Sequence, residues 1–399
     1  MARLCLVLFS IVVCSFVQCA KPRGTTDRRI EPEVRIERIL AGLRPSGTLN
    51  DTTFSTFTLD DRMAHYNVPG VSIAVIHEGR INWARGYGAA EVGTEQVITA
   101  QTLFQAASIS KPLTALAVMV LVEQGKLHLD RDVNEVLKAW KLPENEFKAD
   151  KNVTLTRLLS HTGGINVSSF PGYARGEIIP TLLDVLNGTP PANTKPIRVI
   201  LEPDSDWRYS GGGYCIIQQL MVEITGEGFP ELMTSLVLQP LVMQNSTFEQ
   251  PLPAELLSSA AMGHNASGEV VPGGWHTYPE MAAAGLWTTP ADLARFAMGI
   301  EESVAGGKKA LVSTGTIEHL ATPRFGSFSL GLLVRGAGTE AWFTNNGGNE
   351  GYRCLLYAYV RIGEGAVVMT NSDNGMELAQ EIINAIATEY QWPNFEPEF

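Results

Sequence analysis

Segments typical of β-strands stand near both ends of this chain, and a long stretch of helical patterns separates them. Residues 71–76 are apolar and β-branched, residues 80–87 alternate polar with apolar side chains, and Glu78-Gly79 between them is a turn signal, so the pair predicts a β-hairpin. Strand patterns return only near the other end, at residues 330–335, 352–360 and 366–370. The fold class predicted from this arrangement is α/β (α+β), with one antiparallel sheet built from both chain ends and flanked by helices.

Helical periodicity marks the segments around and between these strands. It is found at residues 34–43, 59–66, 110–124, 155–159, 214–224 and 376–390. The predicted organisation is a polar leader, residues 21–55, followed by a sheet domain formed by residues 56–136 and 281–392. A mainly helical domain, residues 137–280, is predicted to be inserted between the two parts of the sheet domain.

The first twenty residues have the layout of a secretory signal. An apolar run, residues 4–17, follows Arg3 and ends in the small residues Cys19 and Ala20, and a polar segment comes next. We expect residues 1–20 to be removed and the mature protein to be secreted or periplasmic. A retained membrane anchor and a buried N-terminal strand or helix are the alternatives, and contact with a membrane is expected only if this segment is retained.

The net charge of the chain and its cysteine content argue against several classes of binding partner and against a disulfide-linked or zinc-bound structure. The chain has 30 basic and 42 acidic residues, a formal net charge of −12, which disfavours nucleic acid and anionic membrane surfaces as partners. Of the five cysteines, only Cys215 and Cys354 lie outside residues 1–20. Two cysteines cannot build a disulfide framework or a zinc site, and because both stand in apolar segments we expect two separate buried thiols in preference to one disulfide bond.

Ser108 and Lys111 form the one place in the chain where a serine stands three residues ahead of a lysine. On a helix this spacing puts both side chains on one face, so that a lysine amine held out of water can take the serine hydroxyl proton. The motif opens an apolar helix, whose N-terminal amides can face a developing oxyanion. These features favour Ser108 as a nucleophile and Lys111 as its base.

Two further groups could complete a site around this pair. Tyr209, in the sequence Tyr-Ser-Gly, could relay a proton to a leaving group, and an ordinary core aromatic is the alternative. Residues 345–348, Asn-Asn-Gly-Gly, could form a strand whose glycines let the backbone approach a substrate closely. A simple hairpin turn is the alternative for this segment, since Asn-Gly is a strong turn signal.

The order of these groups resembles that of a known enzyme family. Ser108-x-x-Lys111, then Tyr209, then a glycine-rich strand is similar to the order in the active-site serine β-lactamases and penicillin-binding proteins. Residues 125–130, 158–164 and 285–293 also resemble phrases of the branch that holds class C β-lactamases, D-alanyl-D-alanine carboxypeptidases and related esterases. The resemblance spans roughly residues 59–387 and implies a β-lactamase/transpeptidase-like fold.

The resemblance also implies acyl transfer. Ser108 would attack an ester or amide carbonyl, Lys111 would accept its proton, and Tyr209 would help to protonate the leaving group. The backbone N–H groups of Ser108 and Gly348 would stabilise the oxyanion, and water would then hydrolyse the acyl-enzyme.

Two residues depart from the family pattern. The tyrosine motif of the family has Asn where this chain has Gly211, and its strand motif begins with Lys or His where this chain has Asn345. We expect Gly211, Asn345 and Gly347 to contact the substrate, with no cation at Asn345 to bind a carboxylate. A neutral small-molecule ester is therefore the expected substrate. D-alanyl peptidase or β-lactamase activity on an amide is one alternative, and a non-catalytic binding protein that kept the fold and the cleft is another.

Other routes to hydrolysis find no support in the sequence. The chain contains no GxSxG motif, which counts against the α/β-hydrolase fold. None of its seven histidines forms an HExxH pair or another ligand cluster, so neither a metal nor a cofactor is expected. His161 stands in one of the family-like phrases, and we expect it to hold a loop.

Overall fold

The computed structural model of the chain describes residues 31–45, 55–144, 146–147 and 151–396. The predicted signal segment, residues 1–20, lies outside the described residues, as does most of the polar leader. None of the helices in the described part of the chain is both long and apolar enough to cross a membrane.

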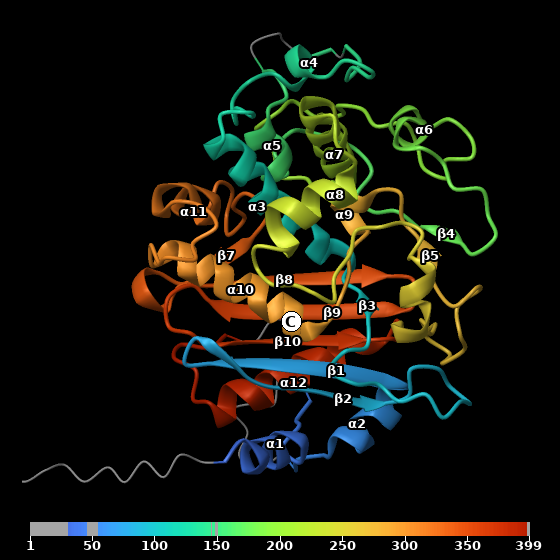
Figure 1. Cartoon of the computed structure of the whole chain (residues 1–399), viewed down its shortest axis with the longest axis vertical. Helices are drawn as coiled ribbons and strands as arrows, with labels where there is room; N and C mark the ends of the chain where they lie inside the picture. The colour runs from blue at the N-terminus through green and yellow to red at the C-terminus, as the bar shows by residue number, and fades with distance from the viewer. Residues whose placement is uncertain (1–30, 46–54, 145, 148–150, 397–399) are drawn as a thin grey trace, which may run out of the picture.

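A six-stranded sheet forms the centre of the molecule, and every pairing in it is antiparallel (Figure 1). The strands follow the order β2-β1-β10-β9-β8-β7, so the N-terminal hairpin joins the sheet through the last strand of the chain. The prediction of one antiparallel sheet built from both chain ends is confirmed. The strands are β1 (Gly70–His77), β2 (Arg80–Gly88), β7 (Leu333–Arg335), β8 (Trp342–Asn349), β9 (Tyr352–Tyr359) and β10 (Gly365–Thr370).

The hairpin of β1 and β2 closes through two residues in the left-handed region, Glu78 with φ 52° and Gly79 with φ 68°. A turn of this kind matches the twist of the strands that it joins, which explains why the Glu-Gly pair sets the register at this point. Nearly all of β1 is buried, since helices cover both faces of the sheet, and its sequence is accordingly apolar except at Ser72 and His77.

Helices cover the two faces of the sheet. One face packs against α12 (Gly375–Glu389), with α1 (Pro32–Leu40) and α2 (Leu59–Tyr66) beyond it, and the other packs against α10 (Pro290–Val304). The structure also contains α3 (Ser110–Glu123), α4 (Val133–Val136), α5 (Leu155–Leu159), α6 (Leu182–Asn187), α7 (Gly211–Thr225), α8 (Phe229–Met233), α9 (Met281–Ala284) and α11 (Thr314–Ala321).

Shorter elements complete the described part of the chain. Two small ladders pair β3 (Phe104–Gln105) with β6 (Trp287–Thr288) and β4 (Tyr173–Ala174) with β5 (His276–Thr277). A π-helical turn, η2 (Thr234–Leu238), and three 3-10 turns, η1 (Ala107–Ile109), η3 (Ala254–Ser259) and η4 (Gly338–Glu340), lie between the larger elements.

The middle of the chain is less helical than we predicted. Among the described helices between residues 137 and 280, α7 is the longest, and irregular connections separate it from the others. Several of these connections contain prolines, such as Pro190, Pro191 and Pro251, which cannot donate a backbone hydrogen bond inside a helix. The domain boundaries at residues 137 and 280 stay a prediction.

The helix α3 is buried along almost its whole length, and it lies between the sheet and the helices of the middle of the chain (Figure 1). Pro112 occupies its first turn, where no backbone donor is needed, and Gly125 follows its end with φ 70°. It contacts α9 and α11, which belong to the second half of the chain. This position places the start of α3 at the junction of the two halves.

Two further expectations can be compared with the structure. The strand predicted at residues 330–335 begins only at Leu333, because Ser329 turns the chain by donating from its N–H and its Oγ to the Leu332 carbonyl. Cys215 in α7 and Cys354 in β9 are separate buried thiols, as predicted.

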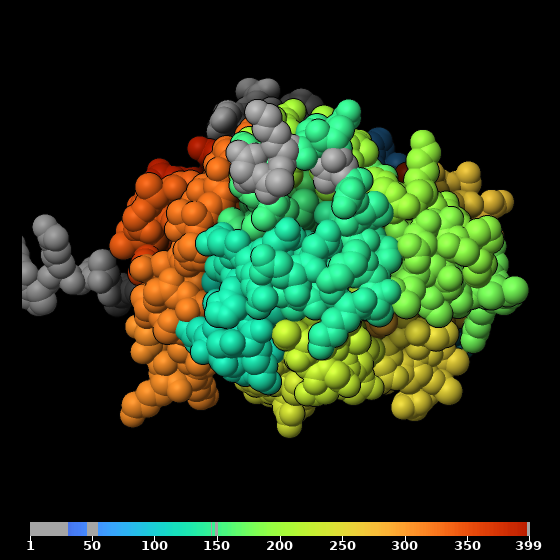
Figure 2. Space-filling view, turned by 90° about the horizontal axis from the view of Figure 1, so that it is seen from above, coloured from blue at the N-terminus to red at the C-terminus, as the bar shows by residue number. Residues whose placement is uncertain are grey.

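Seen from above, the middle of the chain, coloured cyan to yellow, covers most of the face in view, and the orange segment around α11 lies along one side (Figure 2).

Candidate active site

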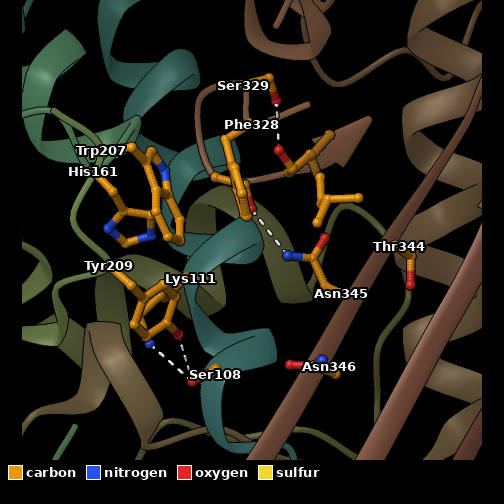
Figure 3. A pocket seen from close by; sticks show the side chains of 13 residues that line it. Ser108, Lys111, His161, Trp207, Tyr209, Phe328, Ser329, Thr344, Asn345 and Asn346 are labelled. Atoms are coloured by element: carbon orange, nitrogen blue, oxygen red, sulfur yellow. Dashed lines mark hydrogen bonds between the residues drawn. The ribbon is translucent and has the colours of Figure 1, made fainter. Parts of the chain in front are cut away.

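Ser108 and Lys111 lie side by side where η1 passes into α3 (Figure 3). The Lys111 Nζ donates to the Ser108 Oγ at 3.0 Å. The residue before the serine, Ala107, has φ 48°, an uncommon value for a residue with a side chain. Such conformations persist only where the surrounding structure holds them, and they concentrate at functional sites.

Tyr209 also reaches the hydroxyl of Ser108. It lies in the connection just before α7, and its hydroxyl donates to the Ser108 Oγ at 2.8 Å (Figure 3). The Lys111 Nζ also lies 4.9 Å from the centre of the Tyr209 ring, a distance at which an ammonium is attracted to the face of an aromatic ring. The structure therefore brings together the three residues that the sequence singled out for chemistry.

Lys111 is buried, with 4% of the residue exposed. Its second hydrogen bond goes to the Ala283 carbonyl in α9, at 2.8 Å. Thr114, one turn further along α3, donates to the neighbouring Ala282 carbonyl at 3.2 Å, which ties α9 to α3 at this point. No ion pair to Lys111 is found within the described residues, so carbonyl and hydroxyl oxygens hold its amine in place.

The segment that could have been a hairpin turn is the interior of a strand. Asn345, Gly347 and Gly348 all lie within β8, and the chain turns only after it, around Gly351 with φ 80°. A Cβ placed on Gly347 would lie 2.2 Å from the Ala106 carbonyl oxygen, closer than any real contact of this kind. Glycine at this position thus lets the β8 backbone lie directly against the turn that carries Ser108.

Asn345 is the position where the resemblance implies a cation, and its amide is engaged by the protein. The Nδ2 donates to the Gly331 carbonyl at 3.2 Å, and the Oδ1 is buried with no hydrogen-bond partner among the described residues. A cation does lie on the neighbouring strand, since the register pairs Gly348 with Arg353. The Arg353 guanidinium is occupied by Asp373 at 3.0 Å and by two backbone carbonyls.

Gly211, the other departure from the family pattern, begins α7 beneath an aromatic ring. A Cβ at this position would lie 2.7 Å from the Phe170 ring and 3.1 Å from the Ser168 carbonyl oxygen. The phenylalanine ring occupies the space that a side chain at position 211 would need. No signal in the sequence connects these two residues.

His161 holds the connection before α7, in agreement with the expected role. Its Nδ1 accepts the Ser210 N–H at 3.1 Å, and its carbonyl accepts the Arg208 N–H at 2.9 Å. Burial, and secondly the positive charge of Lys111, lower the pKa of His161 to about 3, so the imidazole is neutral at physiological pH. The ring lies 4.5 Å from that of Tyr209 and supports it from behind.

A cavity of about 190 Å³ opens beside Ser108 (Figure 3). Its lining holds one charged side chain, that of Lys111, and is otherwise neutral, with aromatic rings, leucines, hydroxyls and amides. Of the residues expected to contact substrate, Asn345 lines this cavity, and Gly211 and Gly347 do not. The lining residues are Ser108, Lys111, His161, Trp207, Tyr209, Phe328, Ser329, Gly331, Leu332, Leu333, Thr344, Asn345 and Asn346.

Two features of the cavity could not be predicted from any pattern in the sequence. Phe328 comes from the connection before β7 and stacks on Trp207, with ring centres 4.1 Å apart. The Ala283 carbonyl approaches Lys111 from a helix 172 positions away. Within the described part of the chain, no group of three His, Cys, Asp or Glu side chains is arranged to hold a metal ion.

Comparisons with known proteins agree with this geometry. Residues 58–390 match the family described as Beta-lactamase. Penicillin-binding protein 4 of Amycolatopsis lactamdurans is 26% identical over 355 residues, which cover 82% of this chain and 88% of that protein.

Two solved structures share the fold. The octameric penicillin-binding protein homologue from Pyrococcus abyssi aligns over 86% of this chain and 76% of its own, with a TM-score of 0.66 and 24% identity. The D-amino acid amidase from Ochrobactrum anthropi, determined with L-phenylalanine amide, aligns over 84% of this chain and 96% of its own, with a TM-score of 0.66 and 22% identity. Because the family match covers most of the sequence, the chain belongs to the β-lactamase-like family of serine hydrolases, which includes penicillin-binding proteins and acts on small-molecule amides and esters.

Proposed function

We propose that this protein is a serine hydrolase that forms an acyl-enzyme on Ser108 and prefers a neutral ester. The observation that carries the proposal is the pair of hydrogen bonds at the Ser108 Oγ, one from Lys111 at 3.0 Å and one from Tyr209 at 2.8 Å. A nucleophile within hydrogen-bond reach of a base, with the base itself oriented by further groups, is the arrangement that nucleophilic catalysis requires.

The reaction follows from these contacts. The Ser108 hydroxyl gives its proton to the Lys111 amine, which must be uncharged to accept it, as the Ser108 Oγ bonds to the carbonyl carbon of the substrate. The tetrahedral intermediate then expels the leaving group as the bond between carbonyl carbon and leaving oxygen breaks. Tyr209 gives that oxygen its hydroxyl proton and is reprotonated from Lys111. Water releases the acid product from Ser108 by the same proton transfers in reverse.

The oxyanion of the intermediate needs two donors aimed at one point. The backbone N–H groups of Ser108 and Gly348 fill this role in our proposal. It is supported by the tight packing of β8 against η1, where Gly347 leaves no room for even one added carbon atom beside Ala106.

The preference for a neutral ester rests on the charges at the cavity. Asn345 is uncharged, His161 is neutral, and Lys111 is engaged by Ser108 and Ala283, so a substrate carboxylate would find no free cation among the lining residues. Charged groups are costly to bury without a partner. Activity on a β-lactam or on a D-alanyl peptide, as in the class C and carboxypeptidase branch, is the second candidate, because the family acts on such amides.

Export of the protein also belongs to this proposal. It rests on the signal-like residues 1–20, which lie outside the described residues. Sequencing the N-terminus of protein purified from its native host tests it. A mature chain that begins after Cys19 or Ala20 supports export, and an intact Met1 in a cytoplasmic fraction contradicts it.

A fluorophosphonate probe, which reacts covalently with activated serines, tests the proposed chemistry. We expect one label on the wild-type protein and none on Ser108→Ala. Ser110→Ala is the matched control, because the Ser110 Oγ is held by the Ala107 carbonyl at 2.6 Å and is not free to attack. A well-folded wild-type protein that takes up no label would indicate a non-catalytic binding protein with the same fold.

A further inference from the structure

Trp207 and Phe328 form an aromatic pair in the lining of the cavity (Figure 3). Their ring centres lie 4.1 Å apart at an angle of 25°, which is a stacked arrangement. Trp207 comes from the connection before α7 and Phe328 from the connection before β7, so the pair joins two distant parts of the chain across the site. The mechanism proposed above gives these two rings no role.

Both rings are held in place before any ligand arrives. On the Trp207 side, the Asp204 carboxylate accepts from the Thr162 hydroxyl at 2.9 Å and from the Arg157 Nε at 2.7 Å, which fixes the connection. On the Phe328 side, the backbone of Phe328 exchanges two hydrogen bonds with that of Phe325, at 2.9 and 3.2 Å. A surface ordered in advance costs less entropy when it binds a ligand.

The position of the Trp207–Phe328 pair places it beside the leaving group of the substrate. Trp207 lies beside Tyr209, with ring centres 6.2 Å apart, and the Tyr209 hydroxyl points at the Ser108 Oγ. If Tyr209 protonates the leaving oxygen, that oxygen must lie within hydrogen-bond reach of it. The rest of the leaving group then extends into the cavity, whose wall on this side is the aromatic pair.

Beyond this pair, Lys111 is the one charged side chain of the lining. Leu332 and Leu333 follow Phe328 along the lining, and the nearby Asn345 is tied to the Gly331 carbonyl. No carboxylate is among the lining residues. A space of this kind stabilises a bulky apolar group and offers little to a small polar one.

We infer that the substrate carries a bulky apolar leaving group, an aromatic alcohol being the best match, which is received by Trp207 and Phe328. This inference rests on the proposed function and names the substrate class for the same site. The pair determines specificity. The leaving group contacts the two rings as the ester bond is positioned over Ser108, and this contact raises kcat/KM for substrates whose leaving group is aromatic.

Two esters with the same acyl group test this inference. Benzyl acetate and ethyl acetate give the same acetyl-enzyme and release alcohols of similar acidity, so the ratio of their kcat/KM values reports contacts with the leaving group. We expect the wild-type protein to favour benzyl acetate, and Trp207→Ala and Phe328→Ala each to reduce that ratio about tenfold. Phe328→Leu serves as a second variant if the alanine variants fold poorly.

Phe325→Ala is the matched control. This phenylalanine lies in the same connection, is 42% exposed, does not line the cavity and should leave the ratio unchanged. An equal rate with both esters in the wild type, or an unchanged ratio in folded variants of the pair, would overturn the inference.

Fluorophosphonate labelling separates this failure from failure of the proposed function, because its fluoride leaving group does not use the aromatic wall. Labelled Ser108 with an unchanged ratio contradicts the inference alone. No label and no hydrolysis of either ester contradicts the proposed function, and the inference falls with it.

Discussion

The two sides of the cavity around Ser108 differ in how closely they follow the related enzymes. On the helix side, Ser108, Lys111 and Tyr209 keep the family residues and are joined by hydrogen bonds of 2.8 and 3.0 Å. On the strand side, Gly347 brings the β8 backbone against the Ser108 turn, and Asn345 stands where the resemblance implies a cation. The three residues proposed to move protons are present, although Gly211 follows Tyr209 where the resemblance implies an Asn, and the side proposed to recognise the substrate lacks the cation that the resemblance implies.

This difference separates chemistry from recognition. The helix side depends on side chains, which are positioned by their contacts with α9 and with the connection before α7. The strand side contributes mainly backbone, so a side chain there can change without altering the reaction itself. Specific substitutions on each side should therefore have effects of different kinds.

The largest effect is expected on the helix side, from loss of the base. Lys111→Ala should lower kcat for a short-chain p-nitrophenyl ester by about a thousandfold or more, because no other group in reach of the Ser108 Oγ can take its proton so readily. Lys126→Ala, a substitution of an exposed lysine just after α3, is the control and should leave the rate unchanged. Retention of most of the activity in Lys111→Ala would show that the base is a different group.

The next largest effect concerns the strand backbone. Gly347→Ala should lower kcat by about a hundredfold, since its Cβ would meet the Ala106 carbonyl at 2.2 Å and push β8 away from the Ser108 turn. Gly315→Ala is the control, because this glycine lies in α11, away from the cavity, and no atom lies within 4 Å of an added Cβ there. Comparable losses in both variants, with the fold checked by circular dichroism, would mean that the approach of the backbone at Gly347 is not what matters.

An intermediate effect is expected for charge on the strand side. Asn345→Lys or Asn345→His should improve hydrolysis of a carboxylate-bearing β-lactam relative to a neutral ester, because a charge-assisted hydrogen bond is worth roughly 1.5–3 kcal/mol. That energy corresponds to a change of about tenfold to hundredfold in relative kcat/KM. Both substitutions also remove the hydrogen bond from the Asn345 side-chain amide to the Gly331 carbonyl, so the gain should lie nearer tenfold than hundredfold. An unchanged ratio in folded variants would show that position 345 does not meet the substrate carboxylate.

The support behind the helix side is expected to affect activity least, and its effect should appear in stability. Glu280 precedes α9, its side chain is fully buried, and neither carboxylate oxygen has a hydrogen-bond partner among the described residues. Burial raises the pKa of Glu280 from 4.5 to about 8. The folded protein then binds this proton more tightly than the unfolded chain, so stability is lost as the pH rises from about 4.5 through 8.

Glu280→Gln should remove this loss, which amounts to at most about 5 kcal/mol at high pH. Thermal midpoints measured from pH 5 to pH 9 should fall for the wild type and stay flatter for the variant. Glu377→Gln, at an exposed glutamate in α12, should follow the wild type. Parallel curves for all three proteins would mean that Glu280 is not a buried protonated acid.

Local patterns were sufficient for the strands, the long helices and the residues that carry the chemistry. The Glu78-Gly79 turn and the start of α3 near Ser110 follow from signals within a few residues, and the antiparallel sheet was predicted from the placement of strand patterns at both chain ends. For residues 345–348 the sequence left a strand and a turn open. Packing against η1 selects the strand, and that contact is not visible in local sequence.

Contacts between distant segments could not be predicted in this way. Phe170 fills the space above Gly211, and the Trp207–Phe328 pair depends on two connections meeting across the cavity. The partial loss of the strand predicted at residues 330–335 has a similar cause, since the hydrogen bonds from Ser329 to Leu332 turn an apolar segment that local preference would extend.

The most direct test of the central claim is to trap the acyl-enzyme. Wild-type protein mixed rapidly with p-nitrophenyl acetate and quenched in acid should carry one acetyl group, found by mass spectrometry on the peptide that contains Ser108. A burst of p-nitrophenol, about one per protein molecule, should accompany it. Ser108→Ala should show neither the acetyl group nor the burst. Steady hydrolysis by a wild-type protein that never carries an acetyl group on Ser108 would contradict the account.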